Sequence, residues 1–179
     1  MRLVLTGASG VGKTSLALLL GEALGVRVIP EVARHLCHEL GYKSPTEITD
    51  QQKFRSQVLD EQIRVENTEA GAFAADRGTI DAWVMWQRWQ LCSAMTFDTE
   101  AYHDKCVQQA KRYTHVVYIP PLFTPPDDAF RWTDKDYIKQ VDRLTRMTLY
   151  DWDLWDRTYT IRTAQPDERV AEIKAWLRA

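Results

Sequence analysis

The residues Gly7-Ala8-Ser9-Gly10-Val11-Gly12-Lys13-Thr14 match the pattern G-x-x-x-x-G-K-[ST] at every fixed position. The apolar run Leu3-Val4-Leu5 precedes them, and a stretch with helical periodicity from Lys13 to Leu24 follows. A buried strand, a glycine-rich turn and the start of a helix form the context in which this pattern binds phosphates. The stretch therefore predicts a phosphate-binding loop (P-loop) between a strand and a helix, rather than a turn that only connects them.

The P-loop predicts a nucleoside triphosphate bound together with Mg²⁺. Its glycines allow successive backbone N–H groups to point at phosphate oxygens, and the helix N-terminus adds the positive end of its dipole. The Lys13 ammonium can reach the β- and γ-phosphates, and the Thr14 hydroxyl is a ligand for Mg²⁺. We expect the nucleotide to contact Gly7, Ala8, Ser9, Gly10, Val11, Gly12, Lys13, Thr14 and Ser15.

The rest of the chain predicts strands that alternate with helices. Apolar runs predict strands over Arg2–Thr6, Val26–Pro30, Ala72–Ala75, His115–Ile119 and Tyr159–Arg162. Helical periodicity and end signals predict helices over Lys13–Leu24, Val32–Leu40, Asp50 to about Ala70, Thr79 to about Met95, Thr99–Arg112, Asp134–Tyr150 and from Pro166 onward. The alternation predicts an α/β fold, a parallel sheet with helices on both sides, in one domain over residues 1–179.

Charged side chains follow two of these strands, at the sheet edge where open parallel sheets bind ligands. Glu31 follows the second strand, where it would accept a proton from an attacking hydroxyl or hold a metal-bound water; capping the next helix is the alternative. Asp76 ends the third strand, the position of a carboxylate that stabilises Mg²⁺, and it is an alternative base to Glu31. Arg77 would orient the acceptor, unless it forms a purely structural pair with Asp76.

Two further segments contribute candidate residues. The segment 120–133 contains Pro120, Pro121, Pro125 and Pro126, which predicts a lid without regular structure, and its Arg131 would neutralise charge on a transferring phosphoryl group. Trp83, Trp86 and Trp89 recur every three residues, a spacing more typical of a packed helix face than of a base-stacking surface. Of these, Trp83 is the candidate for acceptor contact because it is nearest to Asp76.

Composition restricts the class of protein, its partners and its expected location. The 179 residues are 45% hydrophobic and 27% charged, which is typical of a globular domain. The net charge of −2 disfavours DNA as a partner without excluding a local basic groove. The three cysteines indicate neither a disulfide framework nor a zinc site, and the apolar runs are too short for a signal peptide or a membrane span, so we expect a cytoplasmic protein.

The chain resembles the P-loop kinases and AAA-type ATPases related to the nicotinamide riboside kinase domain, which have an adenylate-kinase-like core. The similar segments are the P-loop, Ile29 to Arg34, Ala75 to Ala82, and the Asp128 to Arg131 part of the lid, although Ala129 replaces a common glycine. The resemblance implies a three-layer P-loop NTPase fold with a five-stranded parallel sheet. It also implies ATP as the nucleotide, with adenine near Thr163 to Pro166, and Arg34 among the substrate-binding residues. The segment from Gly41 to Gln57 matches nothing in the family and is expected to shape the acceptor pocket.

These observations favour a kinase that transfers the γ-phosphate of ATP to a hydroxyl of a nucleoside-like or related small molecule. In this hypothesis Lys13, Mg²⁺ and Arg131 act on the phosphates, and Glu31 or Asp76 receives the acceptor proton. One alternative acceptor is a hydroxymethylated base in DNA, as in 5-hydroxymethyluracil DNA kinases. A different class, a regulatory ATPase that acts as a nucleotide-dependent switch, stays open as well.

Overall fold

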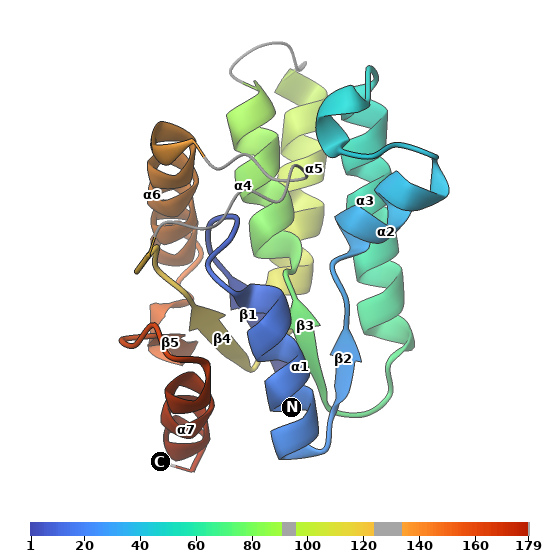
Figure 1. The fold of residues 1–179 in the computed structure, drawn as a ribbon. Helices are drawn as coiled ribbons and strands as arrows, with labels where there is room; N and C mark the ends of the chain where they lie inside the picture. Colours follow the sequence, from blue (N-terminus) through green and yellow to red (C-terminus); the bar gives the residue numbers. More distant parts are fainter. Residues whose placement is uncertain (91–95, 124–133, 179) are drawn as a thin grey trace.

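A five-stranded parallel sheet forms the centre of the computed structural model, which describes residues 1–90, 96–123 and 134–178 (Figure 1). The strands follow the order β2-β3-β1-β4-β5 across the sheet. Their bounds are β1 (Arg2–Thr6), β2 (Arg27–Ile29), β3 (Phe73–Asp76), β4 (His115–Tyr118) and β5 (Thr158–Thr160). The strand that leads into the P-loop is therefore central, between β3 and β4.

Helices cover both faces of the sheet because the strands are apolar on both faces. Leu3 and Leu5 pack with Leu16 and Leu20 of α1 in one core cluster, and Val4 packs with Phe73 in another. The helices are α1 (Lys13–Leu24), α2 (Val32–Glu39), α3 (Gln51–Thr68), α4 (Thr79–Gln90), α5 (Thr96–Ala110), α6 (Lys135–Asp151) and α7 (Pro166–Trp176), with short 3₁₀ turns η1 (Pro45–Glu47) and η2 (Trp155–Arg157). The predicted three-layer α/β fold with five parallel strands is confirmed.

Most predicted elements agree with the structure to within a few residues, and the differences have local causes. Strand β2 is shorter than predicted because Val26 donates its N–H to Gly21 of α1, at 3.0 Å, and Pro30 has no N–H to donate. The predicted loop from Gly41 to Thr49 contains η1, whose first turn is capped by Ser44. The predicted end of the fourth helix, at Met95, lies outside the described residues.

Helices α3, α4 and α5 extend beyond the carboxyl edge of the sheet and pack against one another there (Figure 1). Trp86 is fully buried and stacks on Tyr102, with ring centroids 4.0 Å apart. Trp83 and Trp89 are half-buried against the same cluster. The tryptophan series thus forms a helix-packing face. Within the described ranges, no helix is long and apolar enough to cross a membrane.

Candidate active site

The P-loop connects β1 to α1 through backbone conformations that favour glycine. Gly7 has a φ of 142°, and a Cβ there would collide with the carbonyl oxygen of Ile119. Gly12 has a φ of 91° and forms the N-cap of α1 in the left-handed region. These turns curl the backbone at the N-terminus of a helix, the geometry that binds phosphate.

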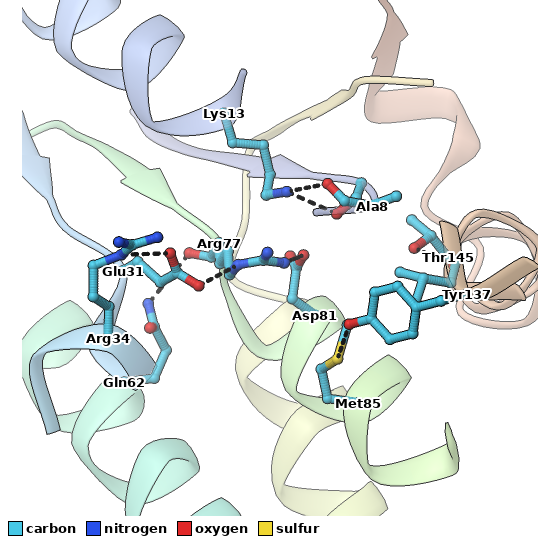
Figure 2. Close-up of polar contacts among 12 residues, drawn as sticks. Ala8, Lys13, Glu31, Arg34, Gln62, Arg77, Asp81, Met85, Tyr137 and Thr145 are labelled. Carbon is cyan, nitrogen blue, oxygen red and sulfur yellow. Dashed lines mark hydrogen bonds and ion pairs between the residues drawn. The ribbon is translucent and has the colours of Figure 1, made fainter. Parts of the chain in front are cut away.

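Lys13 is buried at the base of the P-loop, with 4% of its surface exposed. Its Nζ donates to the carbonyl oxygens of Gly7, at 2.8 Å, and Ala8, at 2.6 Å (Figure 2). Burial, together with the positive charge of Arg77, lowers the pKa of Lys13 to about 7. The next two residues, Thr14 and Ser15, are exposed in the first turn of α1.

Arg169 of α7, which was not predicted as a site residue, donates a hydrogen bond to the P-loop backbone. It is 2% exposed; its Nη1 donates to the carbonyl of Val11 at 2.7 Å, and its Nε donates to the carbonyl of Thr163 at 2.9 Å. These bonds join the P-loop to the turn after β5. No local pattern in the sequence indicates a contact between residues 158 positions apart.

Arg77 joins two carboxylates at the carboxyl end of β3. Its Nε donates to Glu31 Oε1 at 2.9 Å, and its Nη1 donates to Asp81 Oδ1 at 2.8 Å (Figure 2). The Nε of Arg34 adds a longer contact to Glu31, at 3.4 Å. Arg77 adopts a φ of 79°, an uncommon backbone conformation for a residue other than glycine. Such local strain is often found at functional sites.

This arrangement corrects two alternatives from the sequence. Glu31 occupies the N-cap position of α2, but its side chain makes no capping hydrogen bond and binds arginines instead. The ion pairs of Arg77 are with Glu31 and Asp81, and none with Asp76 is found in the described part of the chain. Asp81 was not predicted as a site residue, although its position four residues after Arg77 is a spacing that favours ion pairs.

The two carboxyl groups bound to Arg77 have different proton affinities. Burial raises the pKa of Glu31, but the positive charges of Arg77, Lys13 and Arg34 outweigh it and lower that pKa to about 2. For Asp81, burial is the larger effect and raises the pKa despite Arg77 and Lys13. Glu31 is therefore ionised throughout the neutral range.

Asp76 is 2% exposed, and neither of its carboxylate oxygens accepts a hydrogen bond from the described residues. It is paired in register with Leu5, so it lies beside the strand end from which the P-loop begins. Buried carboxylate oxygens without donors are costly unless they bind a cation or its waters. The Asp76 carboxylate and the Thr14 hydroxyl are the oxygen ligands that Mg²⁺ prefers, so these residues fit the ion.

A pocket of about 370 Å³ opens beside these charged residues. Ser9 of the P-loop lines it together with Glu31, Arg77 and Asp81. Its walls include four aromatic residues from α3, α4, α5 and α6: Phe54, Trp89, Tyr102 and Tyr137. The segment 41–57, expected to shape an acceptor pocket, contributes Ser44, Pro45, Thr46, Gln51, Phe54 and Arg55 to the lining.

Not every predicted site residue reaches this pocket. Trp83 is not among the lining residues; its ring lies against His103 with centroids 4.7 Å apart, and Trp89, two turns along α4, lines the pocket instead. Arg34 contacts the site through its ion pair with Glu31. Arg131 and most of the predicted lid lie outside the described residues.

Comparisons with known proteins identify a family and solved structures with the same fold. A family model described as an AAA domain matches residues 2–169. No curated protein matches the chain. Among solved structures, the NadR protein in complex with NAD and AMP-PNP has a TM-score of 0.76 and 13% identity, covering 99% of this chain and 49% of its own. The chain thus spans about half the length of NadR.

Two other solved structures align over nearly the full length of both chains. Deoxyadenosine kinase from M. mycoides with bound dCTP has a TM-score of 0.71 and 13% identity, and the alignment covers 99% of each chain. Shikimate kinase from Aquifex aeolicus has a TM-score of 0.63 and 17% identity, with 99% of this chain and 96% of the other covered. At these identities the similarity establishes the shared fold.

Proposed function

This chain belongs to the AAA domain family, and we propose that it transfers the γ-phosphate of ATP to a hydroxyl of a nucleoside-like or related small molecule. The observation that carries the proposal is the position of the 370 Å³ pocket. It is lined by the P-loop residue Ser9 and by the Glu31–Arg77–Asp81 cluster, so an acceptor inside it lies next to the phosphates. Its volume is in the range of pockets that bind small ligands.

The phosphates are held by groups of the P-loop. Backbone N–H groups of Gly7 to Lys13 and the N-terminus of α1 bind them, and the Lys13 ammonium exchanges its carbonyl partners for phosphate oxygens. Thr14 and Asp76 would hold Mg²⁺, which when bound neutralises phosphate charge during transfer. Arg131, on the predicted lid, is proposed to add charge neutralisation.

Glu31 is the residue proposed to orient the acceptor hydroxyl. It lines the pocket, whereas Asp76 does not, so the two carboxylates are suited to different roles. With its pKa lowered to about 2, Glu31 accepts a hydrogen bond from the hydroxyl but takes its proton only late in the reaction. A loose phosphoryl-transfer transition state requires little earlier proton removal.

The ligands bound to the structural neighbours support a nucleotide donor and a nucleoside-like acceptor. NadR was solved with NAD and AMP-PNP and also with NR, and deoxyadenosine kinase was solved with dATP. We propose that ATP binds this chain with its adenine near the turn from Thr163 to Pro166, which Arg169 joins to the P-loop.

The proposal is tested by measuring ADP production with ATP and Mg²⁺, alone and with nucleosides, nicotinamide riboside, shikimate or hydroxymethylated DNA. Stimulation by a small acceptor that disappears in Lys13→Ala but persists in Lys105→Ala, an exposed lysine of α5, supports it. Stimulation by DNA alone would identify a DNA kinase. Slow turnover that no acceptor accelerates would favour a regulatory ATPase.

A further inference from the structure

Gln62 of α3 lies where the acceptor pocket meets the Glu31–Arg77–Asp81 cluster. It lines the pocket, although only 3% of its surface is exposed. Its Nε2 donates to the backbone carbonyl of Arg77 at 3.4 Å (Figure 2). Because the Arg77 guanidinium binds Glu31, Gln62 lies at the end of the pocket where the acceptor hydroxyl is proposed to react.

Glu66, one turn further along α3, fixes which way the Gln62 amide faces. The Gln62 Nε2 donates to Glu66 Oε1 at 2.7 Å as well as to the Arg77 carbonyl. Both partners are oxygens that accept these hydrogen bonds, and turning the amide over would replace its two N–H donors with a carbonyl oxygen. The amide therefore points its nitrogen at Glu66 and Arg77, and its Oε1 away from them.

Glu66 is itself held in place by the elements around it. It is fully buried; its Oε1 also accepts from the Tyr113 hydroxyl at 2.9 Å, and its Oε2 accepts from Gln109 Nε2 at 2.6 Å. Burial raises the pKa of Glu66, and its hydrogen bonds to Gln109, Gln62 and Tyr113 oppose that rise. Donors from α3, α5 and the turn before β4 thus meet at this carboxyl group and fix its orientation.

The Gln62 carbonyl oxygen is the group that stays available to a ligand. It forms no hydrogen bond with the described residues. Unlike both carboxylate oxygens of Asp76 and Oδ2 of Asp81, it is not fully enclosed by protein, so it remains open to the pocket. When a ligand displaces water from the pocket, only an N–H or O–H group of that ligand can satisfy this oxygen.

We propose that Glu66 acts as a positioning residue for Gln62, so that the site selects an acceptor with a second hydrogen-bond donor, a hydroxyl or an N–H, beside the hydroxyl that receives phosphate. A polyhydroxylated molecule, such as one that carries a sugar, has such a donor, whereas a simple alcohol does not. This inference deepens the proposed kinase function and rests on it. An acceptor without the second donor leaves the Gln62 carbonyl unpaired, which lowers the affinity of that acceptor by about 5- to 150-fold.

The orientation of the Gln62 amide is tested first, without any ligand. In ¹⁵N-labelled protein, the side-chain signals of Gln62 are assigned by their loss in Gln62→Met. We expect its amide protons to exchange with solvent about 10-fold or more slowly than those of Gln57, an exposed residue of the same helix, because they bind Glu66 and the Arg77 carbonyl. Equally fast exchange at both positions would overturn the proposed role of Glu66.

Selectivity is then measured by calorimetry, with the protein saturated by AMP-PNP and Mg²⁺. Adenosine is compared with 2′-deoxyadenosine and with 3′-deoxyadenosine, and shikimate with 4-deoxyshikimate, so that each analogue lacks one donor. In at least one pair, we expect the wild type and the control Gln57→Met to bind the complete molecule about 5- to 150-fold more tightly than the analogue. In Gln62→Met this preference falls to about one, because the analogue no longer leaves a carbonyl unpaired.

Two substitutions at Glu66 separate positioning from packing, and binding of AMP-PNP shows that each variant is folded. Glu66→Met removes the acceptor that fixes the Gln62 amide, so the amide can turn and the preference falls. Glu66→Gln keeps an oxygen toward Gln62, with Gln109 turning its own amide to match, so the preference is retained even where stability is lower. A preference that both variants lose equally, or that Glu66→Met retains, would contradict the positioning role.

The outcomes for the kinase and for this inference differ. Equal binding within every pair would overturn the selection of a second donor. An acceptor with one hydroxyl and no other donor that supports Lys13-dependent ADP production as well as any polyhydroxylated acceptor would leave the kinase standing and remove this inference. A Gln62-dependent preference without any acceptor-stimulated turnover would instead contradict the kinase and keep the donor-selecting site.

Discussion

At the scale of single residues, the site combines charged groups with unusual proton affinities. Lys13 has a pKa lowered to about 7 by burial and by Arg77, and Glu31 has a pKa lowered to about 2 by Arg77, Lys13 and Arg34 against the effect of burial. Arg77 is common to both shifts, which makes this residue the electrostatic centre of the site. Both shifts lead to measurable pH effects.

The Lys13 shift predicts proton uptake on binding of ATP. Below about pH 7 Lys13 is already charged, whereas above it the free protein holds a neutral amine that must gain a proton beside the phosphates. With Mg²⁺ present, calorimetry in buffers of different ionisation enthalpy is expected to show uptake approaching one proton at about pH 8.5, falling toward zero at about pH 6. Uptake that is the same at both pH values, or that persists in Lys13→Met, would contradict this assignment.

The Arg77 cluster predicts a pH-dependent loss of stability in Arg77→Met. This change leaves two buried carboxylates without their shared partner and is expected to lower the free energy of unfolding by about 3–5 kcal/mol at pH 7. In the wild type, the depressed pKa of Glu31 stabilises the fold above about pH 4.5, and this contribution is lost as the pH falls toward 2. Without Arg77, the ionised carboxylates of Glu31 and Asp81 repel each other. This repulsion is lost when they are protonated, so the stability difference between Arg77→Met and the wild type shrinks at low pH.

Denaturant unfolding at pH 7 and at about pH 4 measures this difference. Adding Glu31→Gln to Arg77→Met is the matched control. It removes one of the two negative charges that repel each other and is expected to restore part of the stability. A deficit that does not depend on pH would show that Arg77 acts through packing alone.

At the scale of elements, two long-range contacts hold the site in place. Arg169 joins α7 to the P-loop, and Tyr113, just before β4, joins the start of α4 to α3. The Tyr113 hydroxyl accepts from the N–H of Thr79 at 2.8 Å and donates to the buried Glu66 at 2.9 Å. Glu66 in turn accepts from Gln62, which contacts the Arg77 carbonyl. Both contacts link remote elements to the functional residues.

Arg169→Met is expected to weaken ATP binding while the fold is retained. The carbonyls of Val11 and Thr163 lose a charged donor, a change worth about 1–3 kcal/mol, or about 5- to 150-fold if all of it appears in nucleotide affinity. Titration of AMP-PNP with Mg²⁺ measures the loss, with the exposed Arg162→Met at the same end of the sheet as the control. Equal affinity in the two variants would mean that the P-loop keeps its shape without Arg169.

Tyr113→Phe is expected to lower stability by about 1–3 kcal/mol, because the buried Thr79 N–H loses its acceptor and Glu66 loses a donor. Its effect on turnover should be measured alongside unfolding, since Thr79 begins the helix that carries Asp81. Tyr150→Phe, at a largely exposed tyrosine of α6, is the control and is expected to change neither quantity. Unchanged stability in Tyr113→Phe would show that the hydrogen bonds of Tyr113 do not stabilise the fold.

At the scale of the whole molecule, the sequence predicts the sheet, the P-loop and the charged strand ends, because each depends on a local pattern. Leu3-Val4-Leu5 and the glycine pattern are contiguous, and Glu31 and Asp76 follow apolar runs directly. Arg169 was not predicted, because its contacts depend on how α7 packs against the P-loop rather than on its neighbours in sequence. Trp83 was predicted to contact the acceptor because it is nearer than Trp89 to Asp76 along the chain. The orientation of α4 brings Trp89 to the pocket instead.

The most direct test of the central claim follows the γ-phosphate itself. The protein is incubated with γ-labelled ATP, Mg²⁺ and each acceptor that stimulates ADP production, and the label is located by chromatography. If the protein is a kinase, label appears on the acceptor hydroxyl in step with ADP, and Lys13→Ala abolishes this transfer. Label found only as inorganic phosphate, at a rate that no acceptor changes, would contradict a kinase and identify the protein as a hydrolase of ATP.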